Sequence, residues 1–376
     1  MGITKMKIFY VVRSLEAVPS CIYNIQMIAD SGYETIVATG CSTESINKIM
    51  ESKKIKYIDG KAKRVSNRIV NRLTLTSAFK KSVKEAIKSY ETGDIVFLGT
   101  ADSALAAKKI CKKSTNVLSL KELHEKPWYY PLFLKKIANK CVAVICCEKN
   151  RARILQFRWG LKRRPYTISN KPYGYPTEIC LESTCEQTKN IISQISSEKV
   201  LVYQARHIHF TKELINLAHA LKISGDNYQL ILIGEVDNPE DKVKISNIYP
   251  NLIWTGHISA PKHLEVTSYA KVGIAVYAEN SLNNLFCAPN KTYEYAGFGI
   301  PTLCNDVPGL VETIGLKNAG MCVDWNDVEN IKDGIETIFA DYDSFSKKAK
   351  NFYNSEDNKD KLEQIILNIQ GERKND

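Results

Sequence analysis

The feature that most constrains the fold is an alternation of short apolar runs with amphipathic, helix-like stretches. In the first half the apolar runs of strand length lie at residues 7–12, 33–39, 94–99, 116–120 and 141–147. The alternation restarts at Lys199, and later runs lie at residues 228–234, 251–256, 272–277, 300–304 and 320–323. Strands that alternate with helices in this way indicate a parallel sheet with helices on its faces. The sequence therefore predicts an α/β protein with two tandem, doubly wound, Rossmann-like domains.

A polar, serine-rich stretch at residues 177–198 separates the two series of strands. A chain of 376 residues is also too long for one ordinary core. We expect domains at residues 1–190 and 191–350, followed by a C-terminal helix at 351–376 that packs back on the first domain. Ligands of such folds bind at the carboxyl ends of the strands, so we expect the site in a cleft where the two domains face each other.

Charge is divided unevenly between the two halves. Residues 1–190 carry 34 Lys and Arg against 16 Asp and Glu, a net charge of +18, whereas the remainder carries 18 against 25, a net charge of −7. A strongly basic half favours a partner with phosphates, which could be a nucleic acid, an anionic membrane or a phosphorylated acceptor.

Other features concern the compartment and metal binding. No apolar run is long enough to span a bilayer, and the first residues do not have the pattern of a signal peptide, so a cytoplasmic protein is expected. The 11 cysteines, many in apolar runs, are expected to be reduced. The sequence has no paired C-x-x-C motifs and no D-x-D at a strand end, so we expect no metal and no cofactor.

The stretch A-P-N-K-T-Y-E-Y-A-G-F-G-I-P at residues 288–301 places Lys291 and Glu294 on one face of a helix, just before an apolar run. These two residues could form an ordinary ion pair between positions i and i+3 on a surface helix. Alternatively, the lysine could bind a phosphate while the glutamate binds sugar hydroxyls.

Several segments of the second half occur in the order of a known family. They are Val202–Arg206 with Lys212, Leu230–Gly234, Trp254–His257, Asn284 with Ala288–Lys291, Glu294–Ala296, Gly299–Pro301 and Asp306–Glu312. With these motifs the second half resembles the nucleotide-sugar half of GT-B glycosyltransferases, and is most similar to glycosyltransferase family 4, also called group 1. The resemblance implies a GT-B fold in which the first domain binds the acceptor and the second binds the donor.

The resemblance also implies roles for individual residues. Glu294 would accept hydrogen bonds from the ribose hydroxyls, and Lys291 would lie near the diphosphate or sugar. Arg206 and Lys212 would bind the diphosphate, with helix-surface solvation as the alternative. The remaining residues of the implied donor site are Gly256, His257, Asn284, Asn290 and Gly309. Phe286 stands where many members have a first glutamate, which leaves the donor sugar open.

His124 follows the apolar run 116–120 in the segment L-K-E-L-H-E. This segment is similar to the family's strand-end motif, whose histidine faces the donor sugar. Glu122 and Glu125 are alternatives for activation of the acceptor, or could be solvated loop acids. The loop at residues 13–20 lacks the Gly-Gly turn of many relatives, so we expect no donor contact from it.

Two stretches combine lysine and arginine with apolar side chains, at residues 64–88 and 128–136. Basic amphipathic helices with aromatic residues bind well at lipid headgroups. The alternative is that each helix packs its apolar side on the sheet and leaves the lysines in water.

The function that the resemblance implies is a retaining, metal-independent glycosyltransferase. It would move a sugar from a UDP- or GDP-sugar to a lipid-linked or polysaccharide acceptor, in surface polysaccharide synthesis at the inner face of a membrane. Alternatives are another GT-B enzyme such as a nucleotide-sugar epimerase, a non-catalytic protein, or a nucleic-acid-binding protein that uses the basic half. The sequence has no motif of a nucleic-acid-binding fold, so we expect no nucleic acid as partner.

Overall fold

The computed structural model describes residues 6–63, 65–125, 128–225 and 228–374. It divides the chain into two compact units, one of Met1–Ser169 with Asp357–Asp376 and one of Asn170–Glu356. The division therefore falls after Ser169 and after Glu356, whereas the sequence placed it at 190 and at 350. Arg64 and residues 375–376, which belong to stretches singled out above, lie outside the described residues.

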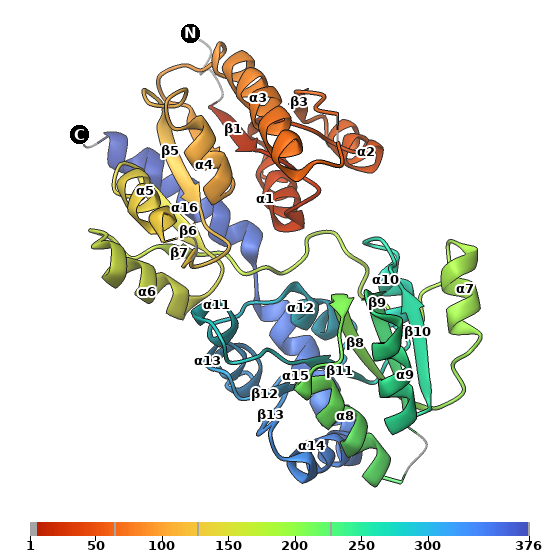
Figure 1. Ribbon diagram of the computed structural model, residues 1–376. Helices are drawn as coiled ribbons and strands as arrows, with labels where there is room; N and C mark the ends of the chain where they lie inside the picture. Colours follow the sequence, from red (N-terminus) through yellow and green to blue (C-terminus); the bar gives the residue numbers. More distant parts are fainter. Residues whose placement is uncertain (1–5, 64, 126–127, 226–227, 375–376) are drawn as a thin grey trace. The chain divides into compact units, whose positions relative to one another are not determined.

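The first unit is built on a seven-stranded sheet with the order β3-β2-β1-β4-β5-β6-β7 (Figure 1). All neighbouring strands are parallel. The strands are β1 (Lys7–Val12), β2 (Glu34–Thr39), β3 (Lys56–Asp59), β4 (Ile95–Leu98), β5 (Thr115–Ser119), β6 (Ala143–Cys146) and β7 (Tyr166–Thr167). The helices are α1 (Pro19–Asp30), α2 (Glu44–Ser52), α3 (Arg68–Ile87), α4 (Ala101–Ala107), α5 (Tyr129–Ala138), α6 (Lys149–Trp159) and α16 (Asn358–Lys374). Helix α16 comes from the end of the chain and packs against α1.

The second unit has a six-stranded parallel sheet with the order β10-β9-β8-β11-β12-β13. Its strands are β8 (Lys199–Ile208), β9 (Tyr228–Val236), β10 (Leu252–Gly256), β11 (Val272–Ala275), β12 (Thr302–Asn305) and β13 (Gly320–Val323). Its helices are α7 (Glu186–Ile192), α8 (Lys212–Ile223), α9 (Pro239–Ile248), α10 (His263–Thr267), α11 (Leu282–Leu285), α12 (Asn290–Gly297), α13 (Pro308–Leu310), α14 (Val328–Ala340) and α15 (Tyr342–Ser355), with a π-helical turn at Val311–Gly315.

Both sheets have the strand order of a doubly wound Rossmann fold, in which the order reverses beside the first strand. The reversal lies between β1 and β4 in the first unit and between β8 and β11 in the second. The predicted α/β fold class with two Rossmann-like domains is confirmed. Because ligands of such sheets bind where the order reverses, the ends of β8 and β11 are the place to look for a site.

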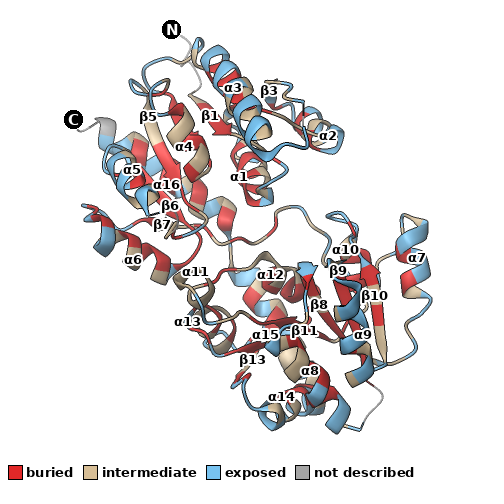
Figure 2. Cartoon of the chain, viewed as in Figure 1, coloured by how far each residue is buried: buried red, intermediate tan, exposed pale blue. Residues whose placement is uncertain are grey.

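The core of the second unit has two layers, because successive side chains of a strand point to opposite faces of the sheet. From β8, Leu201 packs with residues of α8 and α14 on one face. Its neighbours Val200 and Val202 pack with residues of α10 and α12 on the other. Figure 2 shows the strands of both units as mostly buried, while the helices are exposed on their outer sides.

The polar stretch at residues 177–198 belongs to the second unit, where hydrogen bonds hold it. The buried carboxylate of Glu265 accepts bonds from the Thr184 amide at 3.0 Å, from the Thr184 hydroxyl at 2.5 Å and from the Thr188 hydroxyl at 2.5 Å. These bonds explain why a composition typical of a linker is ordered here. Among the described residues, no helix combines the length and the apolar character that crossing a membrane requires.

Candidate functional site

Helix α12 carries Lys291 and Glu294, and one close contact sets its distance from the sheet. The ring of Tyr295, on the same helix, packs directly on Gly273 of β11. A Cβ atom at Gly273 would lie 2.2 Å from that ring, so only glycine fits there. The Tyr295 hydroxyl donates to the carbonyl of Ile274 at 3.4 Å. The packing of Tyr295 therefore fixes α12 beside the point where the strand order reverses.

Lys291 is half-buried and extends to Gln204 of β8, where the pairing with β9 shifts register. Its ammonium donates to the backbone carbonyl of Gln204 at 2.5 Å. It also lies over two aromatic rings, 5.3 Å from the ring centre of Tyr203 and 5.5 Å from that of Tyr277. Burial lowers the pKa of Lys291 to about 8, although the nearby Glu294 carboxylate acts to raise it. An incompletely neutralised cation in this position favours a bound anion.

Glu294 is almost fully buried, with 9% of its side chain exposed. Its Oε2 lies 3.3 Å from Nε2 of His263, the first residue of α10. The other carboxylate oxygen, Oε1, has no hydrogen-bond partner among the described residues. A carboxylate fixed on one side in this way can accept hydrogen bonds from ligand hydroxyls on the other. The structure gives no ion pair between Glu294 and Lys291 within the described residues, so the two are not a simple surface pair.

Gln204 adds an unsatisfied acceptor inside β8, at the point where the pairing with β9 shifts register. Its side-chain amide nitrogen donates to the Thr267 hydroxyl at 2.6 Å. Its Oε1 is buried and lacks any hydrogen-bond partner in the part of the chain that the structure describes. A buried acceptor without a donor is costly, which makes this oxygen a place where a ligand donor would stabilise the protein.

Arg206 and Lys212 are both exposed. Arg206 lies in β8 itself, where the pairing with β9 shifts register between Gln204 and His207, and its guanidinium has no partner among the described residues. Lys212 is the first residue of α8 and donates to the Asn326 side chain at 2.6 Å. A cavity of about 280 Å³ lies beside Lys212, between the start of α8 and the segments that follow β11 and β13.

The other expected donor residues lie in four separate places. Gly256 and His257 are exposed at the end of β10. Asn284 is in the short helix α11 and donates to the Asn280 side chain at 2.9 Å. Asn290 begins α12 and is half-buried. Gly309 is buried and packs against the backbone of Cys287, where a Cβ atom would come within 2.6 Å of the amide nitrogen, so its structural role is to let α13 approach that loop.

In the first unit, His124 follows β5 with a left-handed backbone (φ 52°), which is uncommon for a residue other than glycine. Its Nε2 is buried and has no hydrogen-bond partner among the described residues. Burial lowers the pKa of His124, while Glu122 and Asp102 act to raise it. A neutral imidazole with a free nitrogen can donate to or accept from a ligand. Glu122 is exposed and Glu125 half-buried in the same loop.

Three side chains next to His124 form a hydrogen-bonded group that the sequence did not suggest. Asp102, near the start of α4, accepts a hydrogen bond from the Tyr130 hydroxyl and forms an ion pair with Arg13. The ring of Tyr130 lies 6.1 Å from that of His124. These contacts connect the segments after β1, β4 and β5, where the strand order of the first unit reverses.

Sequence reasoning missed the partners that position the predicted residues. They are Tyr203, Tyr277 and Gln204 around Lys291, His263 beside Glu294, and the group of Arg13, Asp102 and Tyr130 near His124. Most of them lie far along the chain from the residue they contact, although Tyr130 closely follows His124. The signal that could have found most of them is their place just after a strand or at the start of a helix, where ligands of this fold bind. Tyr203 and Gln204 lie inside β8 and lack even this signal.

Comparison with known families gives one match. Residues 186–358 match the family described as glycosyl transferases group 1. No curated protein matches the chain.

Solved structures show the same fold over the whole chain, at low sequence identity. The Anabaena protein Alr3699/HepE, solved in complex with UDP and glucose, is 13% identical over 97% of this chain and 100% of its own, with a TM-score of 0.71. A glycosyltransferase from Rickettsia africae is 15% identical, with 98% of both chains covered and a TM-score of 0.69. A Listeria monocytogenes structure named for UDP-N-acetylglucosamine 2-epimerase activity is 14% identical over 99% of this chain and 98% of its own, with a TM-score of 0.65.

Proposed function

We propose that this chain, a GT-B glycosyltransferase with a group 1 domain at residues 186–358, transfers a sugar from a nucleoside diphosphate to a lipid-linked or polysaccharide acceptor. The pathway that fits such an acceptor is surface polysaccharide synthesis. The first unit binds the acceptor and the second binds the donor.

The observation that carries this proposal is the pair of charged residues on α12. Lys291 is a half-buried cation beside Gln204 of β8, and Glu294 is a buried carboxylate with one oxygen that has no hydrogen-bond partner among the described residues. In our account Lys291 contacts the diphosphate and Glu294 accepts hydrogen bonds from the ribose hydroxyls. The two groups lie on one helix and the ligand needs both, because a sugar nucleotide carries an anion next to a pair of hydroxyl donors.

We propose that the leaving diphosphate is stabilised without a metal ion. Arg206, Lys212 and Lys291 supply positive charge, and no side chain among the described residues caps the first turn of α12, so its backbone amides are available to an anion. Fixed cations of this kind do electrostatically what a metal does in other transferases. Retention of configuration is proposed on the family resemblance alone. Because fixed cations take the place of a metal ion in this proposal, EDTA is expected to leave turnover unchanged.

On the acceptor side, His124 is the residue we propose to contact the reacting groups. Its free, buried Nε2 and its lowered pKa suit a hydrogen bond to a sugar hydroxyl at neutral pH. Glu122 and Glu125 in the same loop are the candidates for acceptor activation. Arg13, Asp102 and Tyr130 act as positioning residues that hold the adjacent segments.

A membrane surface is the partner that fits α3 and α5. Each helix buries some apolar side chains against its unit, but others are exposed in the first half of α3 and at the start of α5. Ile69 is 73%, Leu73 65% and Trp128, just before α5, 78% exposed. Arg72 of α3 lies 3.5 Å from the Tyr130 hydroxyl of α5, so the two helices adjoin. Exposed lysines and arginines surround them, which suits the anionic inner face of a membrane.

The donor we propose is a UDP- or GDP-sugar. Support comes from the Anabaena structure of the same fold, solved with UDP and glucose.

The test is release of nucleoside diphosphate from a panel of UDP-, GDP-, ADP- and TDP-sugars, with a membrane lipid extract as acceptor. We expect release from one donor only, dependent on the extract. Turnover of a donor without any acceptor, to an isomeric sugar nucleotide, would instead support an epimerase. No turnover and no binding across the panel would refute the transferase proposal.

A further inference from the structure

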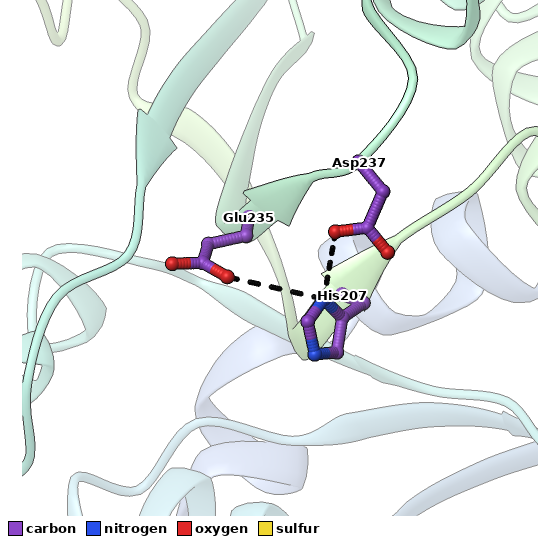
Figure 3. A group of neighbouring side chains, drawn as sticks. All are labelled: His207, Glu235 and Asp237. Carbon is purple, nitrogen blue, oxygen red and sulfur yellow. Dashed lines mark hydrogen bonds and ion pairs between the residues drawn. The ribbon is translucent and has the colours of Figure 1, made fainter. Parts of the chain in front are cut away.

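A second group of side chains lies at the same end of the second sheet, on β8 and β9. In the register of these strands His207 is opposite Glu235. His209 and Asp237 lie just beyond the ends of β8 and β9. The ring of His209 stacks on that of His207, with centroids 6.2 Å apart. Figure 3 shows His207 between the two carboxylates. The neighbouring ends of β8 and β9 thus bring two imidazoles and two carboxylates close together.

The distances suit a shared ion. Nδ1 of His207 lies 3.0 Å from Oδ1 of Asp237 and 3.9 Å from Oε2 of Glu235. Nε2 of His209 lies 3.8 Å from Oδ2 of Asp237. In a tetrahedral site with metal–ligand bonds of about 2.1 Å, neighbouring ligand atoms are about 3.4 Å apart. The three observed separations lie on both sides of that value, so small side-chain movements would bring the ligand atoms to it.

Charge and access also suit a cation. A single nitrogen of His207 lies near two carboxylates, and an N–H group there can donate to only one of them at a time. The side chains of His207, Glu235 and Asp237 are 39%, 56% and 53% exposed, so an ion can enter without unfolding. Nitrogen and oxygen ligands together favour borderline ions such as Zn²⁺, Ni²⁺ and Co²⁺ over Mg²⁺ and Ca²⁺.

We propose that His207, Glu235 and Asp237, with His209 beside them, form a binding site for one borderline divalent transition-metal ion. This proposal goes beyond the proposed function and does not depend on it, because none of the four residues belongs to the proposed donor or acceptor contacts. The ion would add positive charge to the segment that contains Arg206. It is a bound ion beside the site and takes no part in the transfer, so removing it leaves turnover intact.

The experiment is a calorimetric titration of the full chain, stripped with EDTA, with Zn²⁺ and in parallel with Ni²⁺. The wild type, His207→Gln and Asp237→Asn are compared with His219→Gln, which removes an exposed histidine of α8 outside the group. Using Ni²⁺ as well separates this site from the 11 cysteines, whose thiols favour Zn²⁺.

We expect one equivalent of metal that is lost, or bound at least tenfold more weakly, in His207→Gln and Asp237→Asn and is retained in His219→Gln. The same metal should raise the unfolding temperature of the wild type but not of the first two variants. Equal stoichiometry and affinity in all four proteins, or no binding by the wild type, would overturn the proposal. If either variant unfolds at a lower temperature without metal, Glu235→Gln replaces it in the comparison.

Discussion

At the scale of single residues, the site depends on charges that the protein holds only partly neutralised. Lys291 has a carbonyl and two aromatic rings as neighbours, and these solvate an ammonium less well than water does. The pKa of Lys291 is lowered because the charged ammonium is solvated less well here than in water. A bound diphosphate would stabilise the charged ammonium. The poor solvation that favours the neutral amine in the free protein therefore also strengthens the attraction of the ammonium for an anion.

This gives a prediction for the pH dependence of donor binding. Because the pKa of Lys291 is about 8, the ammonium is charged at pH 7 and loses its proton as the pH rises through 8. If only the charged form binds, the Kd for a sugar nucleotide rises about tenfold between pH 7 and pH 9. Calorimetry at pH 7 and at pH 9 measures this Kd. Lys212→Gln, which removes an exposed charge, should weaken binding at both pH values and keep the same slope. A Kd that does not change over this range would show that Lys291 does not hold the diphosphate.

At the scale of elements, the position of α12 follows from the contact between Tyr295 and Gly273. The motif at residues 288–301 predicts a helix with Lys291 and Glu294 on one face, and the structure has this helix at Asn290–Gly297. The sequence could not predict how α12 is held, since Gly273 precedes it by many residues and nothing local to either segment indicates the pairing. The extension of β8 through Arg206 and His207 was also not expected, because these charged and polar residues belong to no apolar run.

Substituting Gly273 tests this contact. In Gly273→Ala the new Cβ atom would overlap the Tyr295 ring, and overpacking of this kind costs about 1–3 kcal/mol of folding free energy. We expect a lower midpoint of urea unfolding and, because α12 moves, weaker binding of the nucleoside diphosphate. The control is Gly371→Ala, at an exposed position of α16 with open space around it, which should not destabilise the protein. Unchanged stability and affinity in Gly273→Ala would mean that α12 is positioned by other contacts.

At the scale of the whole molecule, the sequence predicts the number and the fold of the two domains better than it predicts the residues at which they begin and end. The alternation of strands and helices was sufficient for two Rossmann-like sheets. The stretch at 177–198 reads as a linker by composition, yet its threonines bond to the buried Glu265, which lies some eighty residues further along the chain. Helix α15 likewise stays with the second unit because Ala349 and Phe352 are buried in its core. Long-range contacts of this kind leave no local pattern.

The exposed apolar side chains of α3 and α5 predict binding to anionic vesicles. Replacing Leu73 and Trp128 together by serine removes two side chains that are 65% and 78% exposed. We expect the vesicle-bound fraction in sedimentation to fall at least fivefold, and wild-type binding to weaken as salt is raised. Leu316→Ser, at a residue that is 67% exposed in the second unit, is the matched control. Binding that is equal in all three proteins would exclude α3 and α5 as the membrane surface.

The measurement that tests the central claim most directly is the affinity of wild type and Glu294→Gln for UDP and GDP, by calorimetry at pH 7. Our account predicts that the wild type binds at least one of them. Losing a charged acceptor for the ribose hydroxyls costs about 1.5–3 kcal/mol, so Glu294→Gln should bind roughly ten- to a hundredfold more weakly. Glu336→Gln, an exposed position of α14, should bind as the wild type does. Equal affinity of wild type and Glu294→Gln for a nucleotide that the wild type binds would contradict the assignment of α12 as the helix that holds the sugar nucleotide.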